Sequence, residues 1–304
     1  MIAVIHYAYG APVSIDNVSD YFSHILKGKQ VPPPMLAKIH ASFLTPGFAD
    51  FIRTATEDIA EGLESVLNEQ LDVEVKVYTA YKHTTPFLVD AIEKAKADGA
   101  TTVVTLPINP IHSASGGGSV HAETAALLEG TVIEHIVLNN WHVNEGVVAV
   151  YAKRVKRAVE WLPVAAQGDA HVLFTVHSQP EDPERNAPYV QQFAELAAAI
   201  AKKAGVANFH AVYRSSGGKA NWLAPDVREK IKDLHAAGAA GFVTCELLSL
   251  AADVESYAEI GVECQEVCKE LNVPFAISDF PGASFDVVQA LSALVVENLK
   301  VAVK

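Results

Sequence analysis

The chain alternates short apolar runs with longer stretches that place apolar residues every three or four positions. The first pattern predicts buried strands, and the second predicts amphipathic helices. Strands and helices that alternate in this way are typical of parallel sheets covered by helices. The expected strands are 2–5, 73–78, 102–106, 171–176, 209–213, 241–248 and 274–277, and the expected helices are 14–26, 49–70, 88–97, 147–161, 189–204, 225–236 and 285–303.

The alternation runs through the chain twice, and the second series begins near residue 143. We therefore expect an α/β protein with two doubly wound, Rossmann-like domains built on parallel sheets. The predicted domains are residues 1–142 and 143–284, and the last helix, 285–304, is expected to pack back on the first domain.

Composition narrows the functional classes. The net charge of −13 argues against a nucleic-acid binder, which needs a surface rich in Lys and Arg, and is compatible with attraction of metal cations. Three cysteines cannot build a disulfide framework, so we expect a cytoplasmic protein in which Cys264 and Cys268 are small buried residues. The apolar N-terminus is too short for a signal peptide and lacks a basic leader. The sequence has no run of eighteen uncharged apolar residues, so we expect no membrane span.

An acidic stretch, DVESYAEIGVE, occupies residues 253–263. Glu255, Glu259 and Glu263 are spaced four residues apart, which places three carboxylates in one row on an α-helix. Like charges at this spacing destabilise a helix slightly, so folding alone gives no reason for the arrangement. Two interpretations remain open: a solvated helix face, or a row that lines a cleft and handles cations or protons.

Polar residues follow several of the predicted strands. Ligands of open parallel sheets bind beyond the carboxyl ends of the strands, where the chain carries Tyr9, His83, His112, His177 and Arg214. His177 directly follows the apolar run VLFTV and therefore lies at the end of a central strand. Opposite carboxylates it can accept protons, because the pKa of an unperturbed histidine lies near neutrality.

Two segments of the second half resemble the ferrochelatase family. Glu255-Ser-Tyr-Ala-Glu259-Ile-Gly-Val-Glu263 is similar to the acidic-helix signature of that family, including the spacing of its three acids. Phe174-Thr-Val-His177-Ser-Gln-Pro180 resembles the strand that carries the catalytic histidine.

Further motifs agree in order and spacing from residue 1 to about 300. Trp222-Leu-Ala-Pro225 resembles the Trp-Leu-x-Pro motif, and the segment 214–218 before it is a variant of Gln-Ser-x-x-Gly. Ala8-Tyr9-Gly10-Ala-Pro12 and Tyr81-Lys82-His83, followed by Pro-Phe, are similar to the soluble Gram-positive branch. The resemblance therefore covers essentially the whole chain.

The resemblance implies a chelatase-like fold that inserts Fe²⁺ into a free-base porphyrin held in a cleft between the two domains. In the Gram-positive branch this porphyrin is coproporphyrin III; protoporphyrin IX is the other expected substrate. By motif position, His177 and Glu255 would be the catalytic pair and would bind the metal. Glu259 and Glu263 would extend the acid row toward solvent, and Tyr9 would lie on the opposite porphyrin face, able to ligate iron.

The remaining implied contacts concern the porphyrin. Tyr9, Lys27, Ser113 and Trp222 would bind it by motif position. No definite role follows for Lys82, His83 or Asp253. The family usually has Asp-His where this chain has Ala252-Asp253, and Asp253 can substitute only electrostatically for that histidine.

The resemblance also implies that Fe²⁺ and the porphyrin are the substrates. We expect no required cofactor, no iron–sulfur cluster because no CxC-type cysteine cluster is present, and a monomer. Two other functions remain open: a haem- or porphyrin-binding protein that does not metallate, and a chelatase for another tetrapyrrole or metal, such as sirohydrochlorin with cobalt or nickel. A nucleotide enzyme is the alternative from the fold alone, and the dinucleotide glycine fingerprint is missing.

Overall fold

Two four-stranded parallel sheets form the framework of the computed structural model, which describes residues 1–12, 14–34, 36–37, 40, 51–113, 116–216 and 220–302. The strand order is β2-β1-β3-β4 in the first sheet and β6-β5-β7-β8 in the second. The bounds are β1 Ile2–Ala8, β2 Val75–Tyr81, β3 Thr102–Pro107, β4 Glu134–Val137, β5 His171–His177, β6 Asn208–Arg214, β7 Phe242–Glu246 and β8 Phe275–Ile277. The predicted α/β class with parallel sheets is confirmed.

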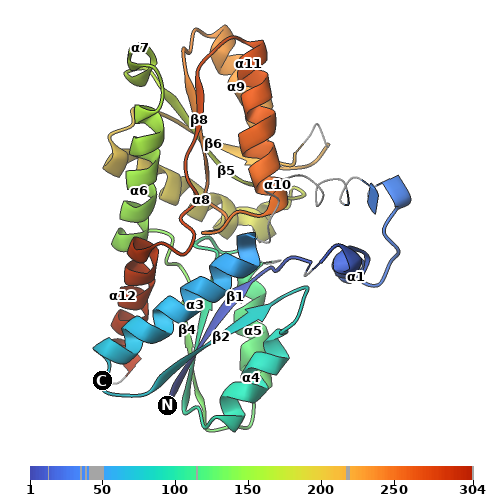
Figure 1. Cartoon of the computed structure of the whole chain (residues 1–304), viewed down its shortest axis with the longest axis vertical. Helices are drawn as coiled ribbons and strands as arrows, with labels where there is room; N and C mark the ends of the chain where they lie inside the picture. The colour runs from blue at the N-terminus through green and yellow to red at the C-terminus, as the bar shows by residue number, and fades with distance from the viewer. Residues whose placement is uncertain are drawn as a thin grey trace. The chain divides into compact units, whose positions relative to one another are not determined.

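The first sheet belongs to a compact unit made of residues 1–108, 115–139 and 295–304. Helices α4 (Leu88–Ala97) and α5 (Gly117–Leu127) cover one face through Ile92 and Val120, which pack in one buried cluster with Ile5 of β1. Helix α3 (Phe51–Gln70) packs against β1 and β2 (Figure 1). The predicted start of this helix at residue 49 lies outside the described residues. Helix α1 (Val18–Ile25) follows a short 3-10 turn, Ile15–Asn17.

The second sheet belongs to a unit made of residues 109–114 and 140–294. Helices α6 (Glu145–Glu160) and α8 (Pro183–Ala204) pack on each other and contact β7 and β6, respectively. Helices α9 (Val227–Ala236) and α11 (Cys264–Glu270) bury a second cluster against β5, β6 and β7. Figure 1 shows these two pairs of helices on opposite sides of the sheet. The short helix α7, Val164–Gln167, follows α6.

The last helix, α12 (Phe285–Ala302), contributes its first part to the second unit and the part from Val295 to the first unit. Within the second unit Arg154 of α6 holds the beginning of α12. Its Nη1 and Nη2 donate to the two carboxylate oxygens of Asp286 over 3.0 and 3.1 Å.

Several elements differ from the sequence expectations. Helix α8 begins at Pro183 rather than at residue 189, because the Asp182 side chain accepts a hydrogen bond from the Arg185 amide and Pro183 suits the first helical turn. Helix α5 and strand β4 were not predicted. Helix α5 starts in a glycine run without an apolar stripe, and β4 is only four residues long. Helix α4 matches its predicted bounds.

Both sheets place their first strand between the second and the third, so the chain switches direction beside β1 and beside β5. In open parallel sheets this switch point opens a crevice at the carboxyl ends of the strands. Tyr9 follows β1 there, and Lys82 and His83 follow β2. In the second unit His177 ends β5, Arg214 ends β6 and Glu246 ends β7.

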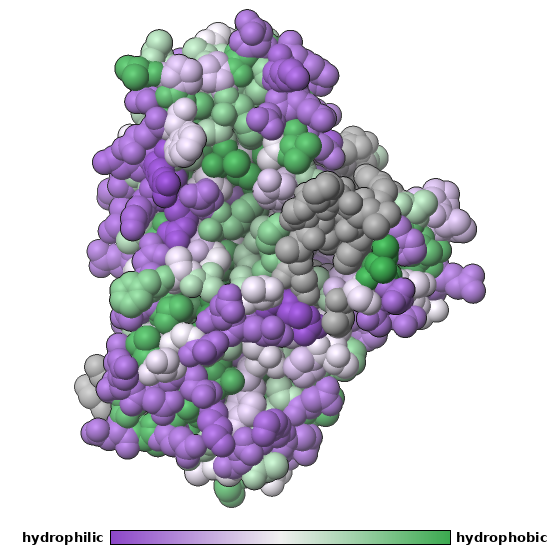
Figure 2. Space-filling view, in the orientation of Figure 1, coloured by the Kyte–Doolittle hydropathy of each residue, from purple (hydrophilic) through white to green (hydrophobic). Residues whose placement is uncertain are grey.

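The three cysteines, Cys245, Cys264 and Cys268, are free and buried, as expected for the second and third. Hydrophilic side chains cover much of the outer surface in Figure 2, in keeping with the acidic composition. In the described part of the chain, no helix is both long and apolar enough to cross a membrane.

Candidate active site

His177 and Glu255 lie next to each other in the second unit. Nε2 of His177 is 3.4 Å from Oε2 of Glu255. His177 is supplied by the end of β5, and Glu255 by the short helix α10, Val254–Tyr257. The imidazole is partly exposed and the carboxylate is 58% exposed, so both can be reached by a ligand. The structure thus brings the two predicted catalytic residues together.

The backbone around His177 decides which ring nitrogen is available. Nδ1 is hydrogen-bonded to the carbonyl oxygen of Ser178. Because a carbonyl oxygen only accepts, Nδ1 must carry the hydrogen in the neutral ring. Nε2 then presents its lone pair beside Glu255, where it can accept a proton or ligate a metal ion. The buried Tyr189 hydroxyl donates to the His177 carbonyl over 2.8 Å and steadies this end of β5.

A buried arginine lies beside this pair. The side chain of Arg214 is 2% exposed. Its Nε donates to Oε2 of Glu246 over 3.1 Å, and its Nη2 donates to Oδ2 of Asp253 over 3.3 Å. Glu246 also accepts from the Thr175 hydroxyl over 2.8 Å. The register explains the grouping, because Arg214 pairs with His177 and Glu246 pairs with Thr175, two positions before His177.

Burial and neighbouring charges both shift the pKa values of Arg214, Glu246 and Glu259. Burial disfavours the charged guanidinium, but Glu246, Asp253, Glu255 and Glu259 outweigh it and raise the pKa of Arg214 above its usual value. Burial raises the pKa of Glu246, and Arg214 partly offsets this effect. Burial is also the main reason why the pKa of Glu259 is raised. A permanent cation and several carboxylates therefore share one poorly solvated region.

The acidic stretch does not form the continuous α-helix that would place its three glutamates in one row. After α10 the chain forms a π-helical segment, Ala258–Glu263, and only then α11. A π-helix has i to i+5 hydrogen bonds and is frequent at functional sites. Side chains four residues apart are therefore not stacked as they are on an α-helix. Glu255 and Glu259 both approach Arg214, whereas Glu263 pairs with Arg228.

Glu259 and Glu263 are held by side chains of the second unit. Oε2 of Glu259 accepts from the Ser215 hydroxyl over 2.6 Å, and this side chain is only 14% exposed. Oε2 of Glu263 lies 2.5 Å from Nη1 of Arg228, which also binds the buried carboxylate of Asp226 through Nε and Nη2. The acid row is thus paired along its length, with Glu255 its most exposed member.

Two of the expected porphyrin-binding residues lie in the same unit. The ring of Trp222 is tilted toward the imidazole of His177, with 6.4 Å between the ring centroids. Ser113 is buried, and its hydroxyl lies 3.5 Å from Nε2 of Gln179. Trp222 therefore offers an aromatic surface beside His177.

The other expected site residues belong to the first unit. The ring of Tyr9 lies 4.4 Å from that of His83, whose Nδ1 is 2.8 Å from Nδ1 of His24. Burial lowers the pKa of His83 to about 4, and it also lowers the pKa of Lys82. Lys27 is an exposed residue with a positive φ of 57° just after α1.

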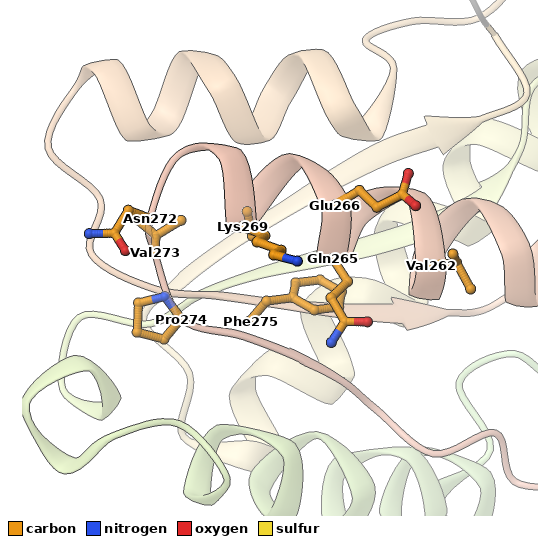
Figure 3. Close-up of a pocket in the computed structure, with 9 residues that line it drawn as sticks. Val262, Gln265, Glu266, Lys269, Asn272, Val273, Pro274 and Phe275 are labelled. Carbon is orange, nitrogen blue, oxygen red and sulfur yellow. The ribbon is translucent and has the colours of Figure 1, made fainter.

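Among the described residues, no group of three His, Cys, Asp or Glu side chains forms a ready-made metal site. His177 and Glu255 supply two groups, and Glu259 is turned toward Ser215. A surface pocket of about 650 Å³ lies between α11 and β8, where Gln265 and Lys269 extend over the ring of Phe275 (Figure 3). Its lining includes none of the predicted site residues, so it adds no group to the site.

The sequence predicted that Arg214 lies at the end of a strand, but it did not predict the contact with Glu246. Glu246 and Ser215 were missed. One signal was present, because Glu246 is the one charged residue inside the run VTCELL. A carboxylate there needs a buried partner.

Comparison with known proteins identifies the chain. The Ferrochelatase family model matches residues 1–299, nearly the whole length. The chain belongs to the ferrochelatase family. It is therefore a member of a family of lyases that insert a metal into a porphyrin, in haem and porphyrin biosynthesis.

Curated relatives in the ferrochelatase family match over full length. The coproporphyrin III ferrochelatase of Bacillus subtilis (strain 168) is 29% identical over 299 residues, covering 96% of each chain. That of Halalkalibacterium halodurans is 28% identical over 306 residues, covering 98% of this chain and 97% of the relative.

Solved chelatase structures share the fold. SirB from Bacillus subtilis with Fe³⁺ aligns with a TM-score of 0.64 at 15% identity, covering 98% of this chain and 95% of that one. CbiX, described as the terminal enzyme of sirohaem biosynthesis in denitrifying bacteria, has a TM-score of 0.53 at 12% identity, covering 97% and 98%. At these identities the likeness concerns the fold alone.

Proposed function

We propose that this ferrochelatase-family protein inserts Fe²⁺ into coproporphyrin III, with protoporphyrin IX as the alternative porphyrin. The observation that carries the proposal is the His177–Glu255 pair, with Nε2 facing the carboxylate at 3.4 Å. The names of the curated relatives support the choice of coproporphyrin III.

The reaction exchanges two pyrrole N–H protons for one divalent ion. His177 accepts a proton at Nε2, because Nδ1 already carries a hydrogen. Glu255 stabilises the resulting imidazolium, and its carboxylate oxygen and Nε2 form a mixed oxygen–nitrogen pair suited to Fe²⁺. The two protons leave to solvent, and the ion ends bound by the four porphyrin nitrogens.

The porphyrin contacts are part of the same proposal. Trp222 provides a flat surface near His177, and the cation of Lys27 can pair with a porphyrin carboxylate. Tyr9 is proposed to contact the porphyrin and to ligate iron through its phenolic oxygen. We also propose a cytoplasmic location, supported by three cysteines that are all free.

One observation favours the alternative of a porphyrin- or haem-binding protein without turnover. Glu259 and Glu263 are engaged by Ser215 and Arg228, and Asp253 by Arg214, so less of the acid row is available for metal delivery. Such a protein would bind the porphyrin or haem tightly without inserting iron.

The test is anaerobic metallation followed by the Soret band, with Fe²⁺ or Co²⁺ and with each of the two porphyrins. We expect turnover of wild type with Fe²⁺, faster with coproporphyrin III. His177→Ala and Glu255→Gln should each lose about a hundredfold or more in kcat, as expected for loss of a proton acceptor or of its partner. Glu270→Gln, an exposed carboxylate at the end of α11, is the matched control and should keep full activity.

The outcomes separate the candidate functions. Tight porphyrin binding without turnover in wild type would support the binding protein instead. Turnover with Co²⁺ but not Fe²⁺ would point to a chelatase for another metal. Turnover that survives in both His177→Ala and Glu255→Gln would contradict the roles given to this pair.

A further inference from the structure

Arg214 is a buried charged side chain beside His177 and Glu255, and four carboxylates surround it. Besides Glu246 and Asp253, its guanidinium approaches Glu255 and Glu259: Nη1 is 3.5 Å from Oε2 of the former and 3.6 Å from Oε2 of the latter. Oε2 of Glu255 therefore lies between Arg214 and His177, at nearly equal distances from both.

The contacts of the guanidinium are unequal. Nε and Nη2 make hydrogen bonds, to Glu246 and Asp253. Nη1 is buried and, among the described residues, has no hydrogen-bond partner. Hydrogen bonds to Glu246 and Asp253 thus fix one edge of the guanidinium. Nη1, on the other edge, approaches Glu255 and Glu259 without forming a hydrogen bond to either. A buried donor in this condition costs free energy unless something uses it.

Folding stability gives little reason to keep such an arrangement. A buried ion pair usually recovers no more than the cost of removing its charges from water, and apolar residues of similar size often serve as well. A guanidinium also stays charged at every physiological pH, unlike a histidine. It supplies a fixed positive charge at one edge of the acid row.

We propose that Arg214 is a positioning residue that holds Glu255 and Glu259 beside His177 and compensates their charge while the metal is absent. The acid row then binds a free divalent cation only weakly, and Glu255 stays where it can serve His177. This inference rests on the proposed function, because it assigns Arg214 a role through the residues that handle the metal.

The direct test removes the guanidinium without leaving Glu246 as a buried carboxylate that has lost its cation. In the double variant Arg214→Gln/Glu246→Gln two amides replace the buried ion pair, and the net charge is unchanged. A change in metal affinity then reports the contact with the acid row rather than the total charge. Co²⁺ is the probe, titrated against porphyrin-free protein and followed by its visible absorption.

We expect the double variant to bind Co²⁺ about tenfold more tightly than wild type, since a cation within 4 Å of two carboxylates weakens their hold on a second cation. In turnover its KM for the metal should fall, while kcat falls because Glu255 has lost its anchor. Arg214→Lys keeps the charge but cannot bind Glu246 and Asp253 at once, so it should keep wild-type Co²⁺ affinity and lose kcat. Lys203→Gln, which removes one cation of the same unit, is the control and should change neither quantity.

Adding Glu255→Gln to the double variant locates the effect, because the gain in Co²⁺ affinity should disappear. Circular dichroism confirms that each variant is folded. Unchanged Co²⁺ affinity in a folded double variant would overturn the proposal, as would a gain that survives Glu255→Gln. A gain in affinity with no turnover in wild type would uphold the role of Arg214 while rejecting iron insertion.

Discussion

His177 and Arg214 are register partners at the carboxyl ends of β5 and β6, so an imidazole and a permanent cation lie side by side. Parallel pairing holds their backbones at fixed spacing, and the two side chains emerge on the same face of the sheet. Glu255 approaches both from outside the sheet. The geometry of the pair is therefore set by the sheet rather than by a mobile loop.

Tyr189→Phe tests how the end of β5 supports His177. The change removes a hydroxyl that donates to the His177 carbonyl over 2.8 Å. We expect a loss of about 1 kcal/mol in the free energy of unfolding and a severalfold lower kcat with an unchanged KM for porphyrin. Tyr151→Phe is the matched control, because that buried hydroxyl makes a longer contact, 3.4 Å, to the Ser249 carbonyl. Equal kcat values in the two variants would argue against this support.

Glu259 and Glu263 should differ in importance. Glu263 is tied to Arg228 at 2.5 Å, whereas Glu259 lies within 4 Å of Arg214 beside the catalytic pair. We expect Glu263→Gln to change kcat and the metal KM by no more than about twofold, as for an ion pair outside the reacting centre. Glu259→Gln should alter the metal KM more strongly. Steady-state metallation with varied Fe²⁺ measures kcat and the metal KM of both variants. A larger effect of Glu263→Gln than of Glu259→Gln would contradict this ranking and would support a metal route along all three glutamates.

His6 should make the protein sensitive to mild acid. Its ring is fully buried in β1, where Nδ1 lies 3.1 Å from the Leu106 carbonyl oxygen, and burial lowers its pKa from 6.5 to about 4. Between these values the unfolded chain binds a proton that the folded chain does not, so stability falls as pH decreases through this window.

The loss in the free energy of unfolding that is attributable to His6 should reach at most about 3 kcal/mol at pH 4 relative to pH 7. Urea unfolding at pH 7, 6 and 5 measures it. His6→Asn, which keeps a donor near the Leu106 carbonyl, should show a shallower pH dependence than wild type. An identical slope in the two proteins would exclude His6 as the source.

Asp286→Asn probes the link between α6 and α12. Hydrogen bonds from Arg154 lower the pKa of Asp286 to about 2. A carboxylate with a depressed pKa stabilises the fold above its unfolded pKa, near 4, and the stabilisation is lost as pH falls toward 2. The variant should lose about 1 kcal/mol at pH 7, and its difference from wild type should shrink below pH 4. A difference that does not vary with pH in thermal melts would point to packing instead.

Periodicity predicted most of the fold because the central strands are apolar and their helices are amphipathic. Helix α4 shows this, with Leu88, Ala91, Ile92 and Ala95 on one buried face. Helix α5 and strand β4 carry no such signal, since one begins with glycine and the other is a short strand that pairs only with β3 among the described strands. Their existence depends on the sheet that they complete.

Site residues that belong to a local sequence motif could be predicted. Contacts that depend on the pairing of strands could not. His177 and Glu255 could be named from their segments. The contact between Arg214 and Glu246 requires the register of β5 with both of its neighbours, which no local pattern encodes. The π-helical turn was missed because the four-residue spacing of the glutamates assumes an α-helix.

The buried cysteines have a consequence for a member of the ferrochelatase family. Burial raises the pKa of Cys245 and Cys268 to about 12 and that of Cys264 still higher, so all three remain thiols at neutral pH. The thiolate is the form that binds soft metals and reacts with peroxide. The three cysteine thiols are therefore buried and in the less reactive form, so metal ions and peroxide find no exposed thiolate among them.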